Sequence, residues 1–530
     1  MNKFIYLIIC SFLFSTPFHS FELNRNSKIL SRSSGDFPQS NGIIDIEPFS
    51  LLETENRFWI STGAGLGRVA CGAIDCSFSG LDANSNIPYG GNPALFSNGD
   101  IVIVSGVTQE YIATTESYEP KGTGIGYSND NGGSWNYMPQ PICVDCTGYQ
   151  NIEWGNQELL ALAVTTDINN VSYDVGLKGN YVYAASWAGG LRRFDYTLNN
   201  PEWEVIPLPM DEQNSLMCDM VDIDNFQLNP RDPIDGGNHN HKGFSVLGTD
   251  DYLWVGTANG INRGTINGDC IDWSHLTTVN GLSGDWVVGI EKQDDRIWAI
   301  TWSAGTGQFN SISYTDDEGN TWNNIEYFSN QNIKIYNLDF DGDDIYAASE
   351  TGLFYSEDAI NWEKVSRLWI DSNTNDIILD ETVYSIANTI SSLFLPVILV
   401  GTGDGLVVHS DEQTIVHRFW NNSSTSESDN QGFSAYPNPF VISSDGILNQ
   451  NGHVRFLYFN PYPLLKSEID IYDFSMNHVI NLSQKINVEN ESTIIWDGRN
   501  SLGNRVVNGT YFCRLSIDNQ EYWTKLLVIN

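Results

Sequence analysis

The residues best suited to metal chemistry lie in one long stretch, from Met210 to Lys242. It holds an Asp-x-Asp pair and the histidine-bearing segment DGGNHNH. Carboxylate oxygens are the ligands that Ca²⁺ prefers, imidazole suits a transition metal, and crowded carboxylates repel unless a cation neutralises them. We therefore expect a Ca²⁺ or similar ion to order this stretch, which we place on the face of the molecule that carries its function. The alternative is a solvated acidic loop with two ordinary histidines. The candidate ligands are Asp222, Asp224, Asp235, His239 and His241.

Two tryptophans are candidates for ligand binding. Trp187 (AASWAGG) and Trp302 (AITWSAG) each come directly after a short apolar run. A flat indole offers a sugar ring apolar area at low entropic cost. The alternative is a tryptophan that covers the mouth of a channel.

Recognisable catalytic motifs are missing from the sequence. It has no GxSxG, P-loop, HExxH or dinucleotide fingerprint. The 66 Asp and Glu residues allow many carboxylate pairs, so a glycosidase pair stays open.

The cysteines indicate an oxidising compartment. CGAIDC and CVDC each place two cysteines close enough for a small loop disulfide, with a metal site or free thiols as alternatives. The candidates are Cys71 with Cys76 and Cys143 with Cys146. Cys218 and Cys270 could pair across the long stretch, which leaves Cys513 unpaired and buried in a strand.

The first twenty residues predict export. Lys3 precedes an apolar run from Phe4 to Phe14 and a polar exit, which is typical of a cleaved signal peptide. No later run reaches the roughly 18 apolar residues of a membrane span. The net charge of −40 repels phosphate backbones and anionic headgroups, so nucleic-acid binding is excluded.

A repeated unit organises the chain up to about residue 420. A short apolar strand, a Gly-containing turn and a second strand recur seven times at a spacing that suits the four-strand blade of a β-propeller. In the fifth unit we expect an outer strand over 322–327. The repeats begin near Arg57, Asp100, Tyr181, Tyr252, Arg296, Asp344 and Val397.

A turn motif between third and fourth strands supports this reading. The pattern S-x-D-x-G-x-x-W occurs once with Ser and once with Thr in its first position, and a third copy lacks the Gly and is one residue short. We expect Asp to accept backbone N–H groups, Gly to take a positive φ, and Trp to pack between blades. The copies are Ser128, Asp130, Gly132, Trp135; Thr315, Asp317, Gly319, Trp322; and Ser356, Asp358, Trp362.

This motif resembles the Asp-box (BNR) repeat of sialidases, sortilin-type receptors, xyloglucanase-type glycosidases and photosystem assembly factors. The resemblance implies a β-propeller and leaves the function open, because enzymes, receptors and assembly factors share it. In the resembling glycosidases the active site lies at the end opposite the Asp boxes, where Trp187 and Trp302 are expected. A sialidase is disfavoured, since the nearest match to its Arg-Ile-Pro segment is Asn86-Ile87-Pro88.

The last 98 residues predict a second module. After the polar stretch NNSSTSESDNQ come short alternating strands typical of an immunoglobulin-like sandwich. YPNPF from Tyr436 and WDGRNxxGxxVxxGxYxxRL from Trp496 resemble the C-terminal Ig-like domain of the flagellar hook-capping (FlgD-like) family and the C-terminal (type A) sorting domains of type IX secretion cargo. The resemblance implies that the secretion machinery is a partner.

Together these features predict an all-β chain, a seven-bladed β-propeller followed by an Ig-like sandwich. The expected parts are a signal peptide at 1–20, the propeller at 21–420, a linker at 421–432 and the C-terminal domain at 433–530. The expected function is a non-catalytic module that binds extracellular glycan or protein, secreted or on the outer surface of a Gram-negative-type bacterium. The alternative is an extracellular glycoside hydrolase or polysaccharide lyase.

Overall fold

The computed structural model describes residues 43–529, with its longer gaps at 50–55, 81–85, 220–225, 366–377, 389–396, 418–432, 443–452 and 461–465. The proposed signal peptide therefore lies outside the described residues. The described chain is nearly all β and carries a propeller, which confirms the predicted fold class. No helix in the described ranges is long and apolar enough to cross a membrane.

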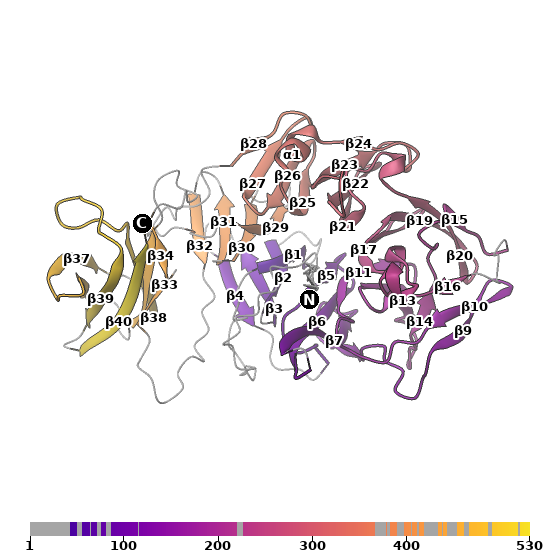
Figure 1. Cartoon of the computed structure of the whole chain (residues 1–530), viewed down its shortest axis with the longest axis horizontal. Helices are drawn as coiled ribbons and strands as arrows, with labels where there is room; N and C mark the ends of the chain where they lie inside the picture. Colours follow the sequence, from indigo (N-terminus) through magenta and orange to yellow (C-terminus); the bar gives the residue numbers. More distant parts are fainter. Residues whose placement is uncertain are drawn as a thin grey trace, which may run out of the picture.

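Antiparallel four-strand meanders make up the propeller, and the described residues contain seven of them. In each, the first strand lies nearest the centre (Figure 1). The first three sheets are β1 (Ile43–Pro48), β2 (Asn56–Thr62), β3 (Gly65–Cys71), β4 (Cys76–Gly80); β5 (Leu95–Ser97), β6 (Val102–Ile112), β7 (Ser117–Ser128), β8 (Asn136–Met138); and β11 (Ser172–Lys178), β12 (Tyr181–Ser186), β13 (Gly190–Asp195), β14 (Glu204–Ile206). The fourth is β17 (Gly243–Gly248), β18 (Leu253–Thr257), β19 (Gly260–Asn267), β20 (Cys270–Leu276).

The remaining sheets follow the same order. They are β21 (Trp286–Gln293), β22 (Arg296–Trp302), β23 (Ser311–Thr315), β24 (Asn323–Asn324); β25 (Ile335–Asp341), β26 (Asp344–Ser349), β27 (Gly352–Ser356), β28 (Glu363–Lys364); and β29 (Val383–Asn388), β30 (Val397–Thr402), β31 (Gly405–Ser410), β32 (Gln413–His417). The outer strand expected over 322–327 is shorter than predicted, because residues 326–331 form the helix α1 (Glu326–Gln331).

Side-chain packing closes the ring. The first inner strand, β1, lies against the last, β29, although more than 300 residues separate them in the chain. One apolar cluster joins the two sheets, and its members include Ile43, Ile46, Ala387 and Leu399. The first and last sheets are therefore held together by burial of apolar area, and within the residues that the structure describes no strand passes from one of them to the other.

The turn motif has the geometry that its residue types predict. In the first copy, Ser134 donates its backbone N–H to Asp130 at 2.8 Å and its hydroxyl at 2.7 Å. Gly132 has a φ of +76° and donates to Ser128 Oγ at 2.8 Å. Trp135 meets Trp59 of the preceding sheet edge to face at 5.8 Å. The hydrogen bonds of Asp130 lower its pKa to about 2, so it stays ionised at neutral pH.

The other two copies repeat this arrangement with local changes. Thr321 donates to Asp317 as Ser134 does to Asp130, and Trp322 meets Trp254 of the preceding sheet at 6.3 Å. In the shortened copy Asp358 accepts from the backbone of Ile360 and Asn361. The motif thus acts as a clamp between neighbouring sheets, which is a structural role.

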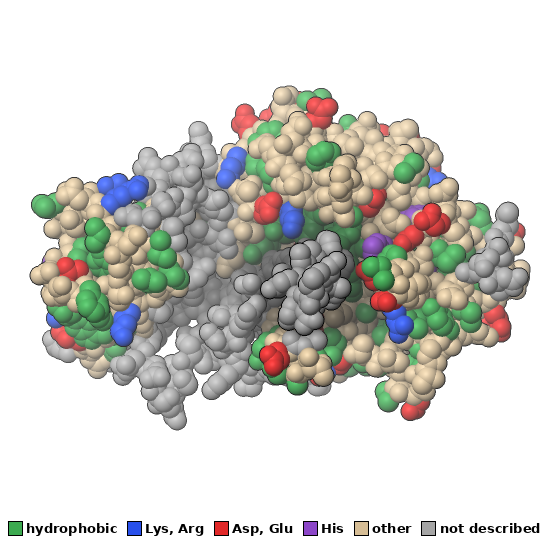
Figure 2. Space-filling view, in the orientation of Figure 1, with side chains coloured by type: hydrophobic (Ala, Val, Ile, Leu, Met, Phe, Trp, Pro, Cys, Tyr) green, Lys and Arg blue, Asp and Glu red, His purple; other side chains and the backbone are tan. Residues whose placement is uncertain are grey.

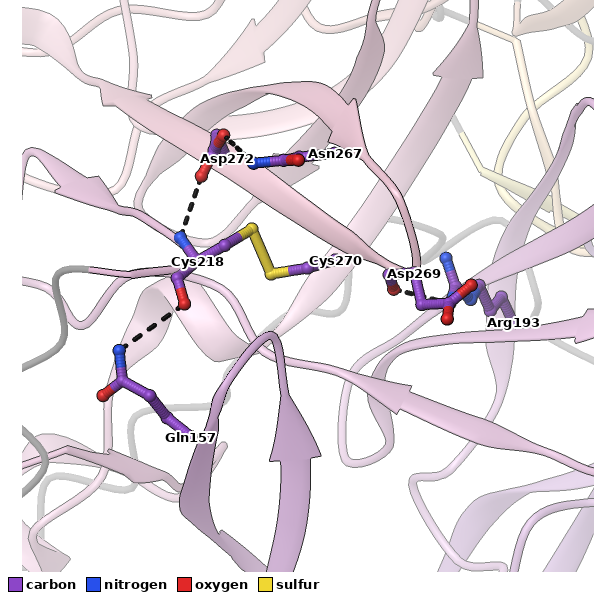
Figure 3. Close-up of a disulfide and its surroundings, with 7 residues drawn as sticks. All are labelled: Gln157, Arg193, Cys218, Asn267, Asp269, Cys270 and Asp272. Atoms are coloured by element: carbon purple, nitrogen blue, oxygen red, sulfur yellow. Dashed lines mark hydrogen bonds between the residues drawn. A yellow bond between two sulfur atoms is a disulfide. The ribbon is translucent and has the colours of Figure 1, made fainter.

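The long connection runs to the outer edge of the propeller. β15 (Ser215–Leu216) pairs with β20, the outermost strand of the fourth meander, and β16 (Gln227–Leu228) joins the hairpin of β9 (Tyr149–Trp154) and β10 (Gln157–Leu162) (Figure 1). The structure pairs Cys218 with Cys270, as Figure 3 shows, and Cys143 with Cys146. Cys513 is free and buried, as predicted.

Cys71 and Cys76, in the propeller, are register partners of β3 and β4, and their side chains lie outside the described residues.

The C-terminal part contains two sheets around a separate core (Figure 1). The sandwich sheets are β33 (Ser434–Tyr436), β35 (Val454–Asn460), β38 (Asn490–Trp496), and β34 (Phe440–Val441), β40 (Gln520–Ile529), β39 (Gly509–Ile517), β36 (Lys466–Tyr472), β37 (His478–Lys485). Phe440, Trp496 and Tyr511 pack together in its core.

Replacing Gly132 by Ala tests the clamp. A Cβ at Gly132 would lie 2.5 Å from the Trp59 ring, and the alanine would have to keep the left-handed φ of +76°. We expect Gly132→Ala to lower the free energy of unfolding by about 2–4 kcal/mol, the sum of backbone strain and overpacking. Gly148→Ala is the matched control, because its φ is +75° and nothing lies within 4 Å of the new Cβ; it should cost only about 1 kcal/mol. Equal losses in denaturant unfolding would contradict the clamp.

Candidate functional site

A β-bulge recurs at one end of the inner strands. In six of the seven described meanders, the pairing of the inner strand with its neighbour shifts register at one residue. A bulge re-aims the extra side chain. The bulged residues are Ile44, Tyr173, Phe244, Val288, Tyr336 and Tyr384.

Aromatic side chains gather around these bulges. Phe244 stacks on Trp187 at 5.3 Å and meets Trp286 at 5.5 Å, while Tyr336 contacts Trp302 at 5.8 Å and Tyr384 at 5.5 Å. Figure 2 shows hydrophobic side chains in the hollow at the centre of the propeller. We call this set the aromatic rim; it consists of Tyr173, Trp187, Phe244, Trp286, Trp302, Tyr336 and Tyr384.

Part of the rim is open and part is core. Trp187, Trp286, Tyr336 and Tyr384 are half-buried, whereas Trp302 is only 3% exposed and donates its indole N–H to the Ile335 carbonyl at 2.9 Å. The Lys242 ammonium lies 4.6 Å from the Trp187 ring, and the Lys334 ammonium lies 4.9 Å from that of Trp302. Of the two predicted ligand-binding tryptophans, Trp187 is accessible, and Trp302 takes the alternative role of a buried cover.

Carboxylates line the channel beneath the rim. They occupy the residue after the bulge and the residue two further on, which point to the same side because side chains alternate along a strand. Asp45, Asp174 and Glu291 surround a cavity of about 80 Å³ together with Tyr336 and Tyr384. We call the full set the channel carboxylates; they are Asp45, Glu47, Asp174, Glu291 and Asp339.

Burial raises the pKa of every channel carboxylate. Each is half-buried by accessible area, and three of them line the small cavity. Desolvation raises the pKa of Asp45, Asp174 and Asp339 to about 7. Desolvation and then repulsion from the other channel carboxylates raise the pKa of Glu47 and Glu291 well above 4.5. The channel therefore holds protons near neutral pH and collects negative charge as the pH rises.

Several of these groups also join neighbouring inner strands. Asp174 accepts from Val175 of its own strand and from Val246 of β17, both at 2.8 Å. Asp339 accepts from Asn388 of β29 at 2.5 Å. A carboxyl that bridges two strands in this way has a structural role as well as a charge.

The structure describes three of the five predicted metal ligands. Asp222 and Asp224 lie outside the described residues, and Asp235 is exposed in η1 (Pro233–Asp235). His239 lies in η2 (His239–His241) with its Nε2 atom 4.0 Å from Asp232 Oδ2. β15 and the Cys218–Cys270 disulfide hold residues 215–218, in the first part of the stretch, at the outer strand β20, and Lys242 at its end lies against the Trp187 ring. The joint placement of the five candidate ligands on the functional face stays a prediction. In the ranges described, no three His, Cys, Asp or Glu side chains form a group that could hold a metal.

The hydrogen bonds of His241 correct its expected role as a metal ligand. Its Nδ1 accepts from the Asn229 backbone at 2.9 Å, and its Nε2 lies 3.0 Å from the Leu208 carbonyl. Burial lowers its pKa to about 4, so the ring is neutral at pH 7. With both nitrogens hydrogen-bonded, His241 has none left for a metal. Its ring instead holds the end of the stretch 210–242, just before β17, against Leu208 and Asn229.

The sequence reasoning missed the rim and the channel carboxylates. The signal was present in the first residues of the inner strands: IIDI, SYDV, GFSV, VVGI, IYNL and VYSI recur at blade spacing. Each places the bulged residue before a small or polar one. Aligning the repeats on these strands, instead of on the second and third, could have revealed it.

Comparisons with solved structures find distant likenesses. PorZ, described as an essential bacterial surface component of the type IX secretion system of Porphyromonas gingivalis, matches with 13% identity over 90% of this chain and a TM-score of 0.40. This chain spans 64% of that protein's length. The extracellular domain of a hybrid two-component system from B. thetaiotaomicron matches with 12% identity over 92% of this chain and 68% of its own, at a TM-score of 0.30.

The WD40 β-propeller domain of Doa1 matches with 10% identity over 72% of this chain and 96% of its own, at a TM-score of 0.36. No family model and no curated protein matches the chain. At these identities and TM-scores the likeness concerns the fold and carries no argument about function.

The channel carboxylates predict an unusual pH dependence of stability. A carboxyl with a raised folded-state pKa keeps a proton that the unfolded chain releases, so its contribution to stability is lost as the pH rises above the unfolded value of 4.5. Glu291→Gln removes that loss. We expect its free energy of unfolding to exceed wild type by about 1–2 kcal/mol at pH 8 and to match it near pH 4.5.

Urea unfolding at the two pH values measures the effect. Glu363→Gln, at an exposed glutamate of β28, is the control and should change neither value. A Glu291→Gln variant that is less stable than wild type at pH 8 would show that the charged form of Glu291 is compensated in the channel.

Proposed function

We propose that this chain is a secreted or cell-surface binding module that holds an extracellular glycan or protein at the aromatic rim. The observation that carries the proposal is the arc of half-buried rings, Trp187, Trp286, Tyr336 and Tyr384, at the mouth of the channel. Such rings offer apolar contact area while losing little conformational entropy on binding, and aromatic residues are enriched where proteins bind partners. The Trp187 ring is further held by Phe244 beneath it and by the Lys242 ammonium.

Two features of the channel favour binding over catalysis. The cavity of about 80 Å³ is far smaller than the roughly 300–1,000 Å³ of small-molecule sites, so a sugar ring has no room beside the carboxylates. Acid–base catalysis also needs two groups with pKa values pushed apart, whereas burial shifts all the channel carboxylates upward.

The alternative is a glycoside hydrolase or polysaccharide lyase. It is favoured by one observation, a carboxyl with a raised pKa, Glu291, beside aromatic side chains that could hold a sugar. A raised pKa is what a general acid requires. A turnover screen on extracellular polysaccharides separates the two functions: the binding module gives retention without products, and an enzyme gives products that Glu291→Gln abolishes.

The proposed localisation outside the cell rests on three features of the chain. The N-terminal segment has the pattern of a signal peptide, and the two disulfides, Cys143–Cys146 and Cys218–Cys270, suit an oxidising compartment. The C-terminal sandwich carries the segments that resemble FlgD-like and type IX sorting domains. We infer that this domain directs the protein through the outer membrane, with the secretion machinery as its partner.

Removing rim rings should weaken binding. A glycan array and a capture assay on the surface polymers of the source cells identify the ligand of the purified mature protein. Trp286→Ala and Tyr384→Ala should each weaken retention of that ligand about 5–30-fold, since one well-packed ring contributes about 1–2 kcal/mol. Phe474→Ala is the control, because Phe474 is 76% exposed in the turn between β36 and β37 of the C-terminal part. Equal losses in all three variants would place the ligand elsewhere.

Deleting the C-terminal sandwich tests the address. A chain ending at residue 432 keeps the whole described propeller and loses strands β33–β40. We expect it to accumulate in the periplasm, while the full chain reaches the surface or the medium. Cell fractionation with immunoblotting measures the distribution. Normal release of the truncated chain would make the sandwich a structural appendage only.

A further inference from the structure

A second concave site lies at the end of the propeller opposite the rim. It is a groove of about 760 Å³ between the third and fourth sheets. Its walls come from the β11–β12 turn, the β17–β18 turn and the β19–β20 turn, and from the end of β21. The volume falls within the range of about 300–1,000 Å³ that is usual for small-molecule sites. We call it the lysine groove, after Lys178 and Lys292 in its lining.

The two lysines differ from most basic residues of this chain. The Lys178 ammonium donates to the carbonyls of Thr249 at 2.6 Å and Asp250 at 3.2 Å, which leaves one of its three N–H donors. Lys292 is exposed. Among the described residues, no carboxylate lies within ion-pair distance of either side chain.

This absence is notable because acids outnumber bases 66 to 26. Other basic residues here are held by acids or rings: Lys121 pairs with Glu110 and Asp167, and Arg296 pairs with Asp316. Burial lowers the pKa of Lys178 more than the charges of Asp250 and Asp251 raise it, which means that its ammonium has lost part of its hydration. An anion in the groove would regain that electrostatic energy.

The floor beside the lysines is aromatic and rigid. Arg193 is bound to Glu204 at 2.7 Å and to the Asp269 carbonyl at 2.8 Å, and its guanidinium lies 4.3 Å from the Tyr181 ring. Arg193 is therefore occupied inside the protein and serves to fix Tyr181. Ile266, 39% exposed, adds apolar surface across the groove.

We propose that the lysine groove binds an acidic oligosaccharide, with one sugar carboxylate between Lys178 and Lys292 and a sugar ring against Tyr181. The turns around it, at Gly179–Asn180, Thr249 and Gly268, present backbone donors and acceptors for hydroxyl groups. Asp250 also lines the groove and repels a second nearby carboxylate. The preferred ligand is thus a sparsely charged glycan with one uronic acid among neutral sugars.

Calorimetric titration of the full mature protein tests this assignment. The probes are an oligosaccharide of three xyloses bearing one glucuronic acid, the neutral xylotetraose, and a short glutamate peptide. We expect the uronate probe to bind at least 10-fold more tightly than the neutral sugar and the peptide. Raising the salt from 50 to 300 mM should weaken the uronate probe and leave the neutral sugar unchanged.

Substitutions locate the site. Lys292→Gln should weaken the uronate probe about 5–10-fold and Lys292→Glu more than 30-fold, because the side chain is exposed and its change leaves the fold intact. Lys364→Gln, at an exposed lysine of β28, is the control and should have no effect. Trp286→Ala should also leave this binding unchanged, which separates the groove from the rim.

Three results would overturn the proposal. These are equal affinity for the neutral sugar, tighter binding of the glutamate peptide, and binding that Lys292→Glu does not change. Loss of uronate binding in Trp286→Ala alone would move the sugar to the rim, which would support the proposed function and reject the groove.

Discussion

Hydrogen bonds between neighbouring inner strands hold the centre of this molecule together. Asp174 of β11 accepts from β17, and Ser245 of β17 donates to the Val287 carbonyl of β21 at 3.0 Å. Asn337 of β25 accepts from Ile386 of β29 at 3.2 Å. Each of these side chains occupies the position just after a bulge. The bulge turns one residue toward the rim and the next toward the neighbouring strand, so the same local irregularity builds the ring and its mouth.

That arrangement places like charges in a small space. Burial makes the charged form of each channel carboxylate costly, and repulsion among them adds to that cost, so these groups keep protons up to neutral pH. Bridging bonds from backbone N–H groups partly offset the cost, since they favour the charged form of Asp174 and Asp339. The stability of the channel therefore depends on pH, and the side chains that a ligand can reach lie at the two ends of the propeller. Aromatic rings mark one end and unpaired lysines the other.

The parts of the fold that were predicted correctly depend on local chemistry. Alternating and apolar runs such as RIWAITW become buried strands because their pattern fits a sheet in any context. The S-x-D-x-G-x-x-W turns formed as expected since Asp130 and Asp317 bond to atoms within four residues. Cys218 and Cys270 were paired from their place around the long connection. The outer strand of the fifth sheet was predicted too long, because residues 326–331 formed a helix whose Phe328 packs on Trp362 of the next unit.

The sequence by itself determined the order of strands and turns and the repeat, because these depend on residues close together in the chain. It also determined the overall charge, which is a sum over the composition. Which side chains share a site depended on how the ring closes, and only the tertiary structure decided it. Asp45 and Glu291 are about 250 residues apart, yet both face one cavity. His241 resembled a ligand in the sequence and became a buried hydrogen-bonded anchor, because Asn229 and Leu208 came to lie on either side of its ring. The role of Lys178 and Lys292 depended on the tertiary structure too, because three sheets bring them to one groove in which neither forms an ion pair with a described carboxylate.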